Sequence, residues 1–176
     1  MRTEVIETQR LYLRSFERED ALFAISIWND YEMGEYLPDE AMEEVSPEYL
    51  KMIEDCAEDD TCYYMISEDK HTRERIGTCS FIISEDGRAM DIAYCVHKKF
   101  WRNGYATEMV RGMVNHAKSC SLEKVTVRVN KNNIGSNKVV RRLDFEVVGE
   151  KSYKKRGTDI TFEDYLYELR LSKAGE

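Results

Sequence analysis

Residues 89–130 place a strand, a helix and a second strand in close succession, and this order constrains the fold more than any other stretch. "AMDIAYCV" (89–96) is an apolar run of strand length, "YATEMVRGMVNHAKS" (105–119) has helical spacing, and "KVTVRVN" (124–130) alternates apolar and polar residues. Two strands joined through a helix lie parallel in one sheet. The sequence therefore predicts a βαβ unit in this half of the chain.

The flanking segments predict hairpins and further helices around that unit. Strands are expected in "RLYLRSF", "CYYMISE", "RIGTCSFIIS", "FEVVGEK" and "DITFEDYLYELRL", with a hairpin turn around Asp86-Gly87. Helices are expected in "REDALFAISIWND", in "SPEYLKMIEDCAE" with Ser46 as N-cap and Pro47 in first position, and in "GSNKVVRRL". We predict an α+β fold in one domain over residues 1–176, with a mixed, mostly antiparallel central sheet of about six to seven strands flanked by helices.

The turn that enters the helix of the βαβ unit contains residues that suit an anion. In "FWRNGYATE" (100–108), Gly104 and the small Ala106 let a ligand approach the backbone, and Arg102 adds a positive charge. The first turn of a helix also leaves N–H groups unpaired at its partly positive end. The segment is either a plain turn or a cradle for a pyrophosphate. Neither G-x-x-x-x-G-K-[ST] nor G-x-G-x-x-G occurs, which argues against ordinary ATP or NAD binding.

Charge is divided between the two halves of the chain. The formal net charge is -8, but residues 39–60 hold ten acids and one base, whereas residues 98–156 hold fifteen bases and five acids. This division favours a cationic substrate and an anionic ligand, unless both segments are solvated helix faces. The overall acidity, without a recognised RNA motif, argues against a nucleic-acid partner.

Composition also indicates a cytoplasmic protein without a metal site. The five cysteines are odd in number and form no C-x-x-C pair, so buried free thiols are expected. The three histidines are scattered, which leaves no metal-ligand cluster. No run is long enough to span a bilayer and the N-terminus lacks an apolar signal core, so no membrane association is expected.

Three blocks of the sequence resemble the GNAT N-acetyltransferases, and in particular their ribosomal-protein N-acetyltransferase branch. "IAYCVHKKFWRNGYATEM" is similar to motif A of the family, [QR]-x-x-G-x-[GA] after the fourth strand. "VNKNNIGSNKVVRRLDF" is similar to motif B, in which N-x-x-S or N-x-x-A precedes a helix that ends near L-G-F. "ETQRLYLRSFEREDA" resembles the T-x-R-L-x-L-R start of the branch. The blocks follow the family's order from Glu7 to Phe145 and imply the acyl-CoA N-acyltransferase fold.

The resemblance implies that acetyl-CoA is bound as the acetyl donor, with no metal. Backbone N–H groups of the turn would hold the pyrophosphate. A fourth strand that splays from the fifth would pair with the pantetheine arm like an added strand, and an asparagine of motif B would hydrogen-bond the same arm. The residues implied are Arg102, Asn103, Gly104, Tyr105 and Ala106 in the turn, Tyr94, Cys95 and Val96 on the strand, and Asn133 in motif B. Lys138, Arg141 and Arg142 either meet the 3′-phosphate or form a solvated helix face.

The sequence departs from the family at three positions. Trp101 stands where motif A has Gln or Arg, an exchange that the ribosomal-protein branch often tolerates. Asp144 replaces the glycine of L-G-F, which changes a local turn more than the chemistry. Val140 stands where many members carry a tyrosine that protonates the departing thiolate. A different acid is therefore needed.

Ser136 and Asp91 are the candidate catalytic residues. Ser136, the serine of N-x-x-S, would be the acid that replaces the missing tyrosine, or a plain N-cap of the helix that follows it. Asp91 precedes "IAY", where related proteins often carry an acid, and is either the general base or a solvent-facing strand residue. Glu163 and Asp164 are weaker candidates for the base, and a water relay to a distant carboxylate is an alternative.

We therefore predict an acetyl-CoA-dependent N-acetyltransferase, an acyltransferase that transfers groups other than aminoacyl groups. The acceptor would be a primary amine, either a protein N-terminus or a small cationic amine, that attacks the thioester directly. Trp28, Tyr31 and Tyr36 either line the acceptor side or belong to the core. A non-catalytic acyl-CoA-binding module is the alternative function, and the resemblance is also compatible with a homodimer.

Overall fold

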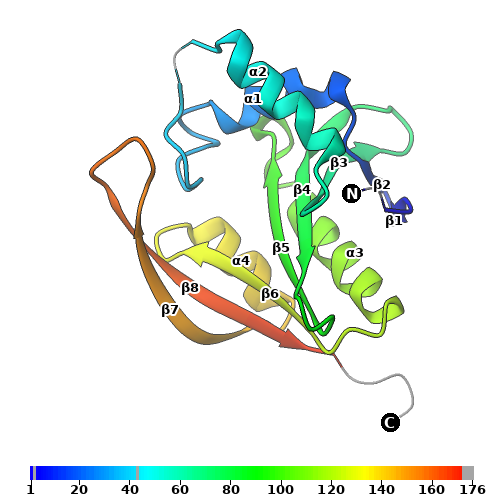
Figure 1. The fold of residues 1–176 in the computed structure, drawn as a ribbon. Coiled ribbons are helices and arrows are strands. Elements are labelled where there is room, and N and C mark those ends of the chain that lie inside the picture. Colours follow the sequence, from blue (N-terminus) through cyan, green and yellow to red (C-terminus); the bar gives the residue numbers. More distant parts are fainter. Residues whose placement is uncertain (2, 43, 172–176) are drawn as a thin grey trace.

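The main feature of the computed structural model, which describes residues 1, 3–42 and 44–171, is one sheet of eight strands. The strands follow one another across it in the order β1-β2-β3-β4-β5-β6-β8-β7 (Figure 1). Their bounds are β1 Ile6–Glu7, β2 Leu11–Ser15, β3 Tyr63–Asp69, β4 Arg75–Ile83, β5 Ala89–Val96, β6 Lys124–Asn130, β7 Glu146–Lys154 and β8 Thr161–Arg170. Neighbours are antiparallel except β5 and β6, which are parallel. The predicted fold class and βαβ unit are confirmed.

Four α-helices and three short 3₁₀ helices accompany the sheet in the described residues. The α-helices are α1 Ala21–Trp28, α2 Pro47–Glu54, α3 Tyr105–Ser119 and α4 Ile134–Arg142, and the 3₁₀ helices are Arg18–Asp20, Asp55–Glu58 and Lys98–Phe100. Ser46 caps α2 as predicted, because its side chain accepts the N–H of Tyr49 at 3.2 Å. The eighth strand, β1, was not predicted, since two residues are too few to show an alternating pattern. No helix in this part of the chain is long and apolar enough to cross a bilayer.

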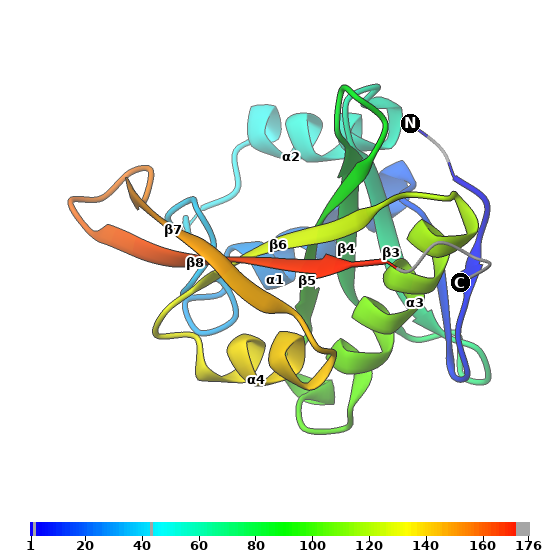
Figure 2. The same ribbon diagram turned by 90° about the horizontal axis from the view of Figure 1, so that it is seen from below.

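The helices cover both faces of the sheet and divide the core in two. Met109 of α3 and Val140 of α4 are buried in the larger core with Met90 of β5. Ile53 of α2 is buried in a smaller core with Ile66 of β3 and residues of α1. Figure 2 shows α2 and α4 on opposite sides of β6 and β8.

β5 and β6 are paired over only part of their length. Their parallel register runs from Ala89–Lys124 to Asp91–Thr126 and then stops, and Figure 1 shows the strands diverging from that end. Beyond it, β5 stays paired with β4, and β6 stays paired with β8. The facing edges of residues 92–96 and 127–130 thus border an opening in the sheet, which we call the gap. The splayed strands that the resemblance implied are present.

Two connections meet across the open end of the gap. The turn between β7 and β8 contacts the segment that follows α1, and we call residues 34–40 together with residues 155–157 the strap. The ammonium of Lys155, which is buried, donates to the carbonyls of Gly34 and Glu35 at 3.2 and 2.8 Å. The guanidinium of Arg156 forms a two-point ion pair with Asp39. The strap therefore links the half of the sheet that carries β5 to the half that carries β8.

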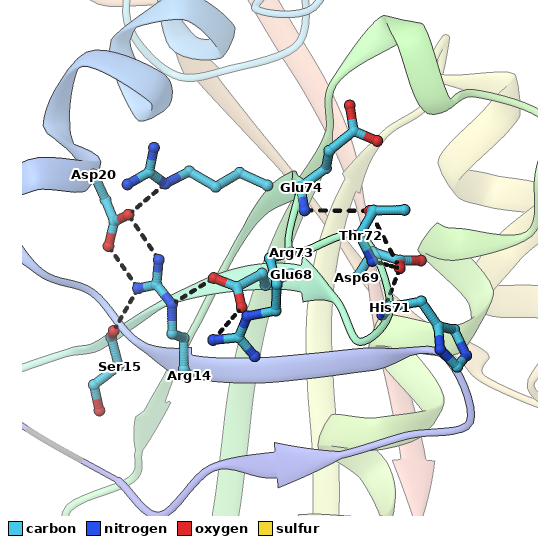
Figure 3. Close-up of polar contacts among 10 residues, drawn as sticks. Arg14, Ser15, Asp20, Glu68, Asp69, His71, Thr72, Arg73 and Glu74 are labelled. Carbon is cyan, nitrogen blue, oxygen red and sulfur yellow. Dashed lines mark hydrogen bonds and ion pairs between the residues drawn. The ribbon is translucent and has the colours of Figure 1, made fainter.

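A network of ion pairs fixes the start of α1 against β2 (Figure 3). The guanidinium of Arg14 donates to Asp20 at 2.7 and 2.9 Å and to Glu68 at 3.1 Å, and Arg75 donates to Asp20 at 2.7 Å. Asp20 is fully buried. Burial acts to raise the pKa of Asp20, but hydrogen bonds from Arg14 and from the backbone N–H of Glu17 outweigh it and hold that pKa below its usual value. The carboxylate therefore stays charged in the folded protein.

Candidate active site

The turn before α3 presents a row of free backbone donors. Arg102 and Gly104 have left-handed backbone conformations, with φ of 62° and 80°, and Gly104 is the N-cap of α3. The first backbone hydrogen bond of the helix runs from Glu108 N–H to the carbonyl of Gly104 at 3.1 Å. Among the described residues, the N–H groups from Arg102 to Thr107 have no partner. Consecutive free N–H groups at a helix N-terminus form an anion-binding concavity.

Side chains from the β1–β2 hairpin hold this turn in place. The carboxylate of Glu108 accepts the hydroxyl of Thr8 at 2.6 Å and the Nε of Arg10 at 2.7 Å. The Nη2 of Arg10 reaches the carbonyl of Asn103 at 3.1 Å, and its guanidinium lies 4.2 Å from the ring centre of Tyr105. Glu108 is thus a structural residue. The N-terminal block and motif A, about a hundred residues apart in the sequence, are parts of one site.

Tyr94 and Val96 turn their backbone groups toward the gap. Val96 lies opposite Gly77 of β4. In the neighbouring pair, His97 N–H donates to the carbonyl of Ile76 at 2.9 Å. Because hydrogen-bonded and non-hydrogen-bonded pairs alternate along an antiparallel ladder, Val96 and Gly77 form a non-hydrogen-bonded pair. The backbone groups of Val96, and two residues earlier those of Tyr94, therefore point away from β4. Those of Cys95 point toward Thr78, its partner on β4. The expectation that Cys95 offers its backbone to the pantetheine arm is thus corrected by the register.

Trp101 ties the turn to the end of β5. Its indole Nε1 donates to the carbonyl of Val96 at 2.7 Å, which leaves the N–H of Val96 as the free group of that residue. Trp101 fills a position where the family usually has Gln or Arg. Here its ring nitrogen ties the end of the splayed strand to the turn before α3.

The N-terminus of α4 faces Tyr94 across the gap. Asn133, not Ser136, is the N-cap: its Oδ1 accepts the N–H of Ser136 at 3.0 Å, which leaves its Nδ2 as the free donor. Ser136 therefore lies in the first turn, and of the two alternatives given for it, the plain N-cap is wrong. The hydroxyl of Tyr94 donates to the carbonyl of Ser136 at 3.5 Å, and burial raises the pKa of Tyr94 to about 12. Sequence reasoning used only the backbone of Tyr94 and missed this hydroxyl.

A cavity of 520 Å³ occupies the gap and contains two carboxylates. Asp91, Tyr94, Asn133, Ser136 and Asp164 are among its lining residues. Asp91 is exposed and its Oδ1 accepts the hydroxyl of Thr126 at 2.7 Å. Asp164 is only 4% exposed and accepts the amide of Asn130 at 3.3 Å. Burial raises the pKa of Asp164, although the Tyr153 hydroxyl, Arg128 and Asn130 act in the opposite direction.

The other acidic and basic candidates lie outside this cavity or have partners. Glu163 is exposed and pairs with Lys131 at 3.3 Å. Arg141 donates to the hydroxyl of Tyr167 at 3.0 Å, whereas Lys138 and Arg142 are exposed on α4. Val140, at the position of the family tyrosine, is fully buried in the core. An acid cannot be supplied from that position, whereas Tyr94 and Ser136 carry hydroxyls and line the cavity in the gap.

A second and larger cavity of 1220 Å³ lies between the sheet and the pair α1 and α2. It shares Ala93, Tyr94 and Cys95 of β5, and Leu37, Pro38 and Arg156 of the strap, with the cavity in the gap. The three aromatic residues considered for the acceptor side lie in different places. Trp28 lines the larger cavity and Tyr36 the smaller one, whereas Tyr31 is 67% exposed and lines neither.

The splayed parallel strands and the row of free N–H groups beside them define the class of protein. The family model described as an acetyltransferase (GNAT) domain matches residues 10–146. The chain therefore belongs to the GNAT family of acetyltransferases, as the three sequence blocks predicted. It is an acetyltransferase enzyme.

Individual relatives support the family over nearly the whole chain. The uncharacterized N-acetyltransferase p20 of Bacillus licheniformis is 29% identical over 171 residues, which cover 94% of this chain and 96% of that protein. A GNAT acetyltransferase from Bacillus anthracis has a similar fold, with a TM-score of 0.82, 16% identity and coverage of 95% and 98%. The spermidine N-acetyltransferase of Vibrio cholerae, in complex with CoA and spermine, gives a TM-score of 0.80 at 18% identity, with coverage of 93% and 97%.

Proposed function

We propose that the protein transfers the acetyl group of acetyl-CoA to the primary amine of a cationic acceptor. The observation that carries this proposal is the gap, because it lies between free backbone groups of β5 and the free N–H groups that start α3. These groups are donors and acceptors that suit an amide-containing arm and a pyrophosphate. A neighbour of the same fold that holds CoA and a polyamine supports the pairing of these two substrates.

The residues of this chain supply binding and proton transfer around the thioester. The N–H groups of Arg102, Asn103, Gly104, Tyr105 and Ala106 bind the pyrophosphate. The backbone of Tyr94 and the N–H of Val96 orient the pantetheine arm, with the Nδ2 of Asn133 opposite them. The free N–H of Val96 also suits the oxyanion that forms when an amine attacks the thioester carbonyl.

Asp164 and Asp91 are the two carboxylates that can receive the proton of the attacking amine. Asp164 suits this role better, because a raised pKa brings a carboxylate nearer to the proton affinity that a base needs at neutral pH. Asp91 already accepts the hydroxyl of Thr126. The hydroxyl of Ser136 or of Tyr94 donates a proton to the departing thiolate. Because the pKa of Tyr94 is raised, its hydroxyl still carries its proton when the thiolate leaves.

Release of CoA thiol in the presence of different amines tests the proposal. The purified protein should release thiol from acetyl-CoA with at least one class among peptides with free N-termini, polyamines and aminoglycosides. Tight binding of acetyl-CoA by calorimetry, without turnover on any of these amines, would instead support the non-catalytic binding module. Failure to bind acetyl-CoA would contradict both functions.

A further inference from the structure

The larger cavity is placed to receive the acceptor. It reaches the gap from the α1–α2 face of the sheet, and Ala93, an exposed small residue on β5, lies where the two cavities meet. An amine in this cavity approaches the gap opposite α4, so it does not compete with the cofactor turn for space. This inference rests on the proposed acetyl transfer and concerns what else the acceptor must carry.

Most of the larger cavity has an apolar or aromatic lining. Phe16, Trp28, Met42, Tyr49, Met52 and Tyr64 are among its lining residues. The indole nitrogen of Trp28 donates to the hydroxyl of Thr78 at 3.1 Å, so the ring is held and its carbon surface remains available. The volume of 1220 Å³ exceeds the ~300–1,000 Å³ of typical cavities for drug-sized ligands. A thin, fully charged chain would leave this surface uncovered.

The rim of the cavity carries negative charge that the protein neutralises only in part. Asp39 pairs with Arg156, and Glu58 pairs with Arg18. Within the described residues, neither Glu40 nor Asp59 forms an ion pair with a lysine or arginine side chain, although the N-terminal ammonium acts on Asp59 and Lys155 acts on Glu40 at longer range. The Thr61 hydroxyl is the main cause that holds the pKa of Asp59 below its usual value, so this carboxylate is charged. Its Oδ1 accepts three hydrogen bonds, from the N–H and hydroxyl of Thr61 and from the N–H of Cys62, and Oδ2 is left to bind a ligand.

We propose that the acceptor is an amphiphilic amine, with an apolar body next to the reacting amine and a second positive charge farther out. The apolar body covers the aromatic and methionine surface under α2. The second cation lies at the rim, near Asp59 and Glu40. A peptide N-terminus with a basic side chain nearby fits this description, whereas a small arylalkyl amine has the apolar body only, and the assay below compares the two.

A matched series of acceptors tests the apolar body and the second charge separately. The tripeptide amides Phe-Ala-Arg, Gly-Ala-Arg and Phe-Ala-Gln each present a single reactive amine. Burial of the phenyl ring should give Phe-Ala-Arg about a ten- to hundredfold higher kcat/KM than Gly-Ala-Arg. Loss of the exposed charge in Phe-Ala-Gln should cost about two- to fivefold, and this difference should shrink in high salt. Phenethylamine and spermidine complete the series.

Two variants with matched controls locate the effect in the cavity. Met52→Glu places a charge on the apolar lining of α2, and Leu22→Glu makes the same kind of change on α1 at an exposed residue outside both cavities. The first should abolish the preference for Phe-Ala-Arg over Gly-Ala-Arg, and the second should leave it intact. Asp59→Asn should remove the preference for Arg over Gln at the third position, whereas Asp60→Asn, an exposed neighbour outside the cavity, should not.

The outcomes separate this inference from the proposed function. If spermidine is acetylated as efficiently as Phe-Ala-Arg and Met52→Glu changes nothing, the protein is an acetyltransferase but the amphiphilic acceptor is wrong. If no amine releases thiol, calorimetry with the CoA-saturated protein decides. Tighter binding of Phe-Ala-Arg than of Gly-Ala-Arg would then support the cavity assignment, and equal binding would overturn it. Phenethylamine turned over faster than Phe-Ala-Arg would assign a small-molecule acceptor and refute the role of the outer cation.

Discussion

The substitution Gly104→Ala tests whether the backbone conformation of the turn before α3, rather than its side chains, determines CoA binding. Gly104 has φ of +80°, and the nearest atom to an added Cβ would be the Nη2 of Arg10 at 3.6 Å, an ordinary contact distance. Steric clash is therefore absent, and the cost of alanine is the conformational strain of a left-handed residue, about 1–2 kcal/mol. The turn is exposed, so we expect it to relax in the free protein and to regain the strained form only on binding.

The strain should appear as a loss of affinity for CoA. A penalty of ~1–2 kcal/mol corresponds to about 5- to 30-fold weaker binding in calorimetry. Gly87→Ala is the matched control, because Gly87 has φ of +68° with no atom within 4 Å of an added Cβ, but lies in the β4–β5 hairpin turn. It should lower the free energy of unfolding by a similar amount and leave CoA affinity unchanged.

Substitutions at Arg102 and a bulkier residue at Gly104 complete the test. Arg102→Ala retains the N–H group and should change affinity little, whereas Gly104→Val adds a β-branched residue in the same conformation and should abolish binding. Wild-type affinity in Gly104→Ala, or equal losses in Arg102→Ala and Gly104→Ala, would refute the assignment of pyrophosphate binding to the backbone.

Three further predictions concern catalysis and stability. Asp164→Asn should lower kcat/KM about 100-fold and remove the rise of activity with pH, whereas Glu163→Gln should do neither. Because burial raises the pKa of Asp164, its ionised form destabilises the fold above that pKa, so Asp164→Asn should keep or raise the melting temperature at neutral pH. Gly77→Ala would place a Cβ 2.1 Å from the carbonyl oxygen of Cys95 and should cost about 1–3 kcal/mol in denaturant unfolding. Asp20→Asn should cost about 3 kcal/mol, because Arg14 and Arg75 lose the charged carboxylate that they share. Since the pKa of Asp20 is depressed, that stability is present above ~pH 4 and lost as pH falls, and the variant should show a weaker acid transition.

Local patterns in the sequence were sufficient for most elements and for the position of the turn before α3. Alternation and turn residues predicted seven of the strands, the turn at Gly87 and the start of α2 at Ser46. The turn before α3 could be found because glycine, helix start and preceding strand are adjacent in the chain. Such features depend on interactions between near neighbours, which a sequence pattern records directly.

Features that depend on pairing between distant segments could not be found in this way. Whether Cys95 or its neighbours face the gap is decided by its register with Thr78 on β4, and a shift of one residue would reverse the result. The burial of Asp164 follows from its place opposite Asn130 and Lys151 in a hairpin that closes late in the chain. The helix start at Asn133 was missed because Asn133 and Ser136 are both favoured caps.

The strap gives the two cavities a common boundary. β5 and β8 belong to two halves of the sheet. These halves are joined at one end of the gap by the pairing of Ala89–Asp91 with β6, and at the other end by the contacts of Lys155 and Arg156. The gap between the two halves is therefore fixed at both of its ends. Leu37 and Pro38 of the strap line both cavities, so a substitution at either residue alters the two cavities together. If the larger cavity binds the acceptor and the gap binds the acetyl donor, as proposed, a change that suits a new acceptor is mechanically coupled to the fit of the donor.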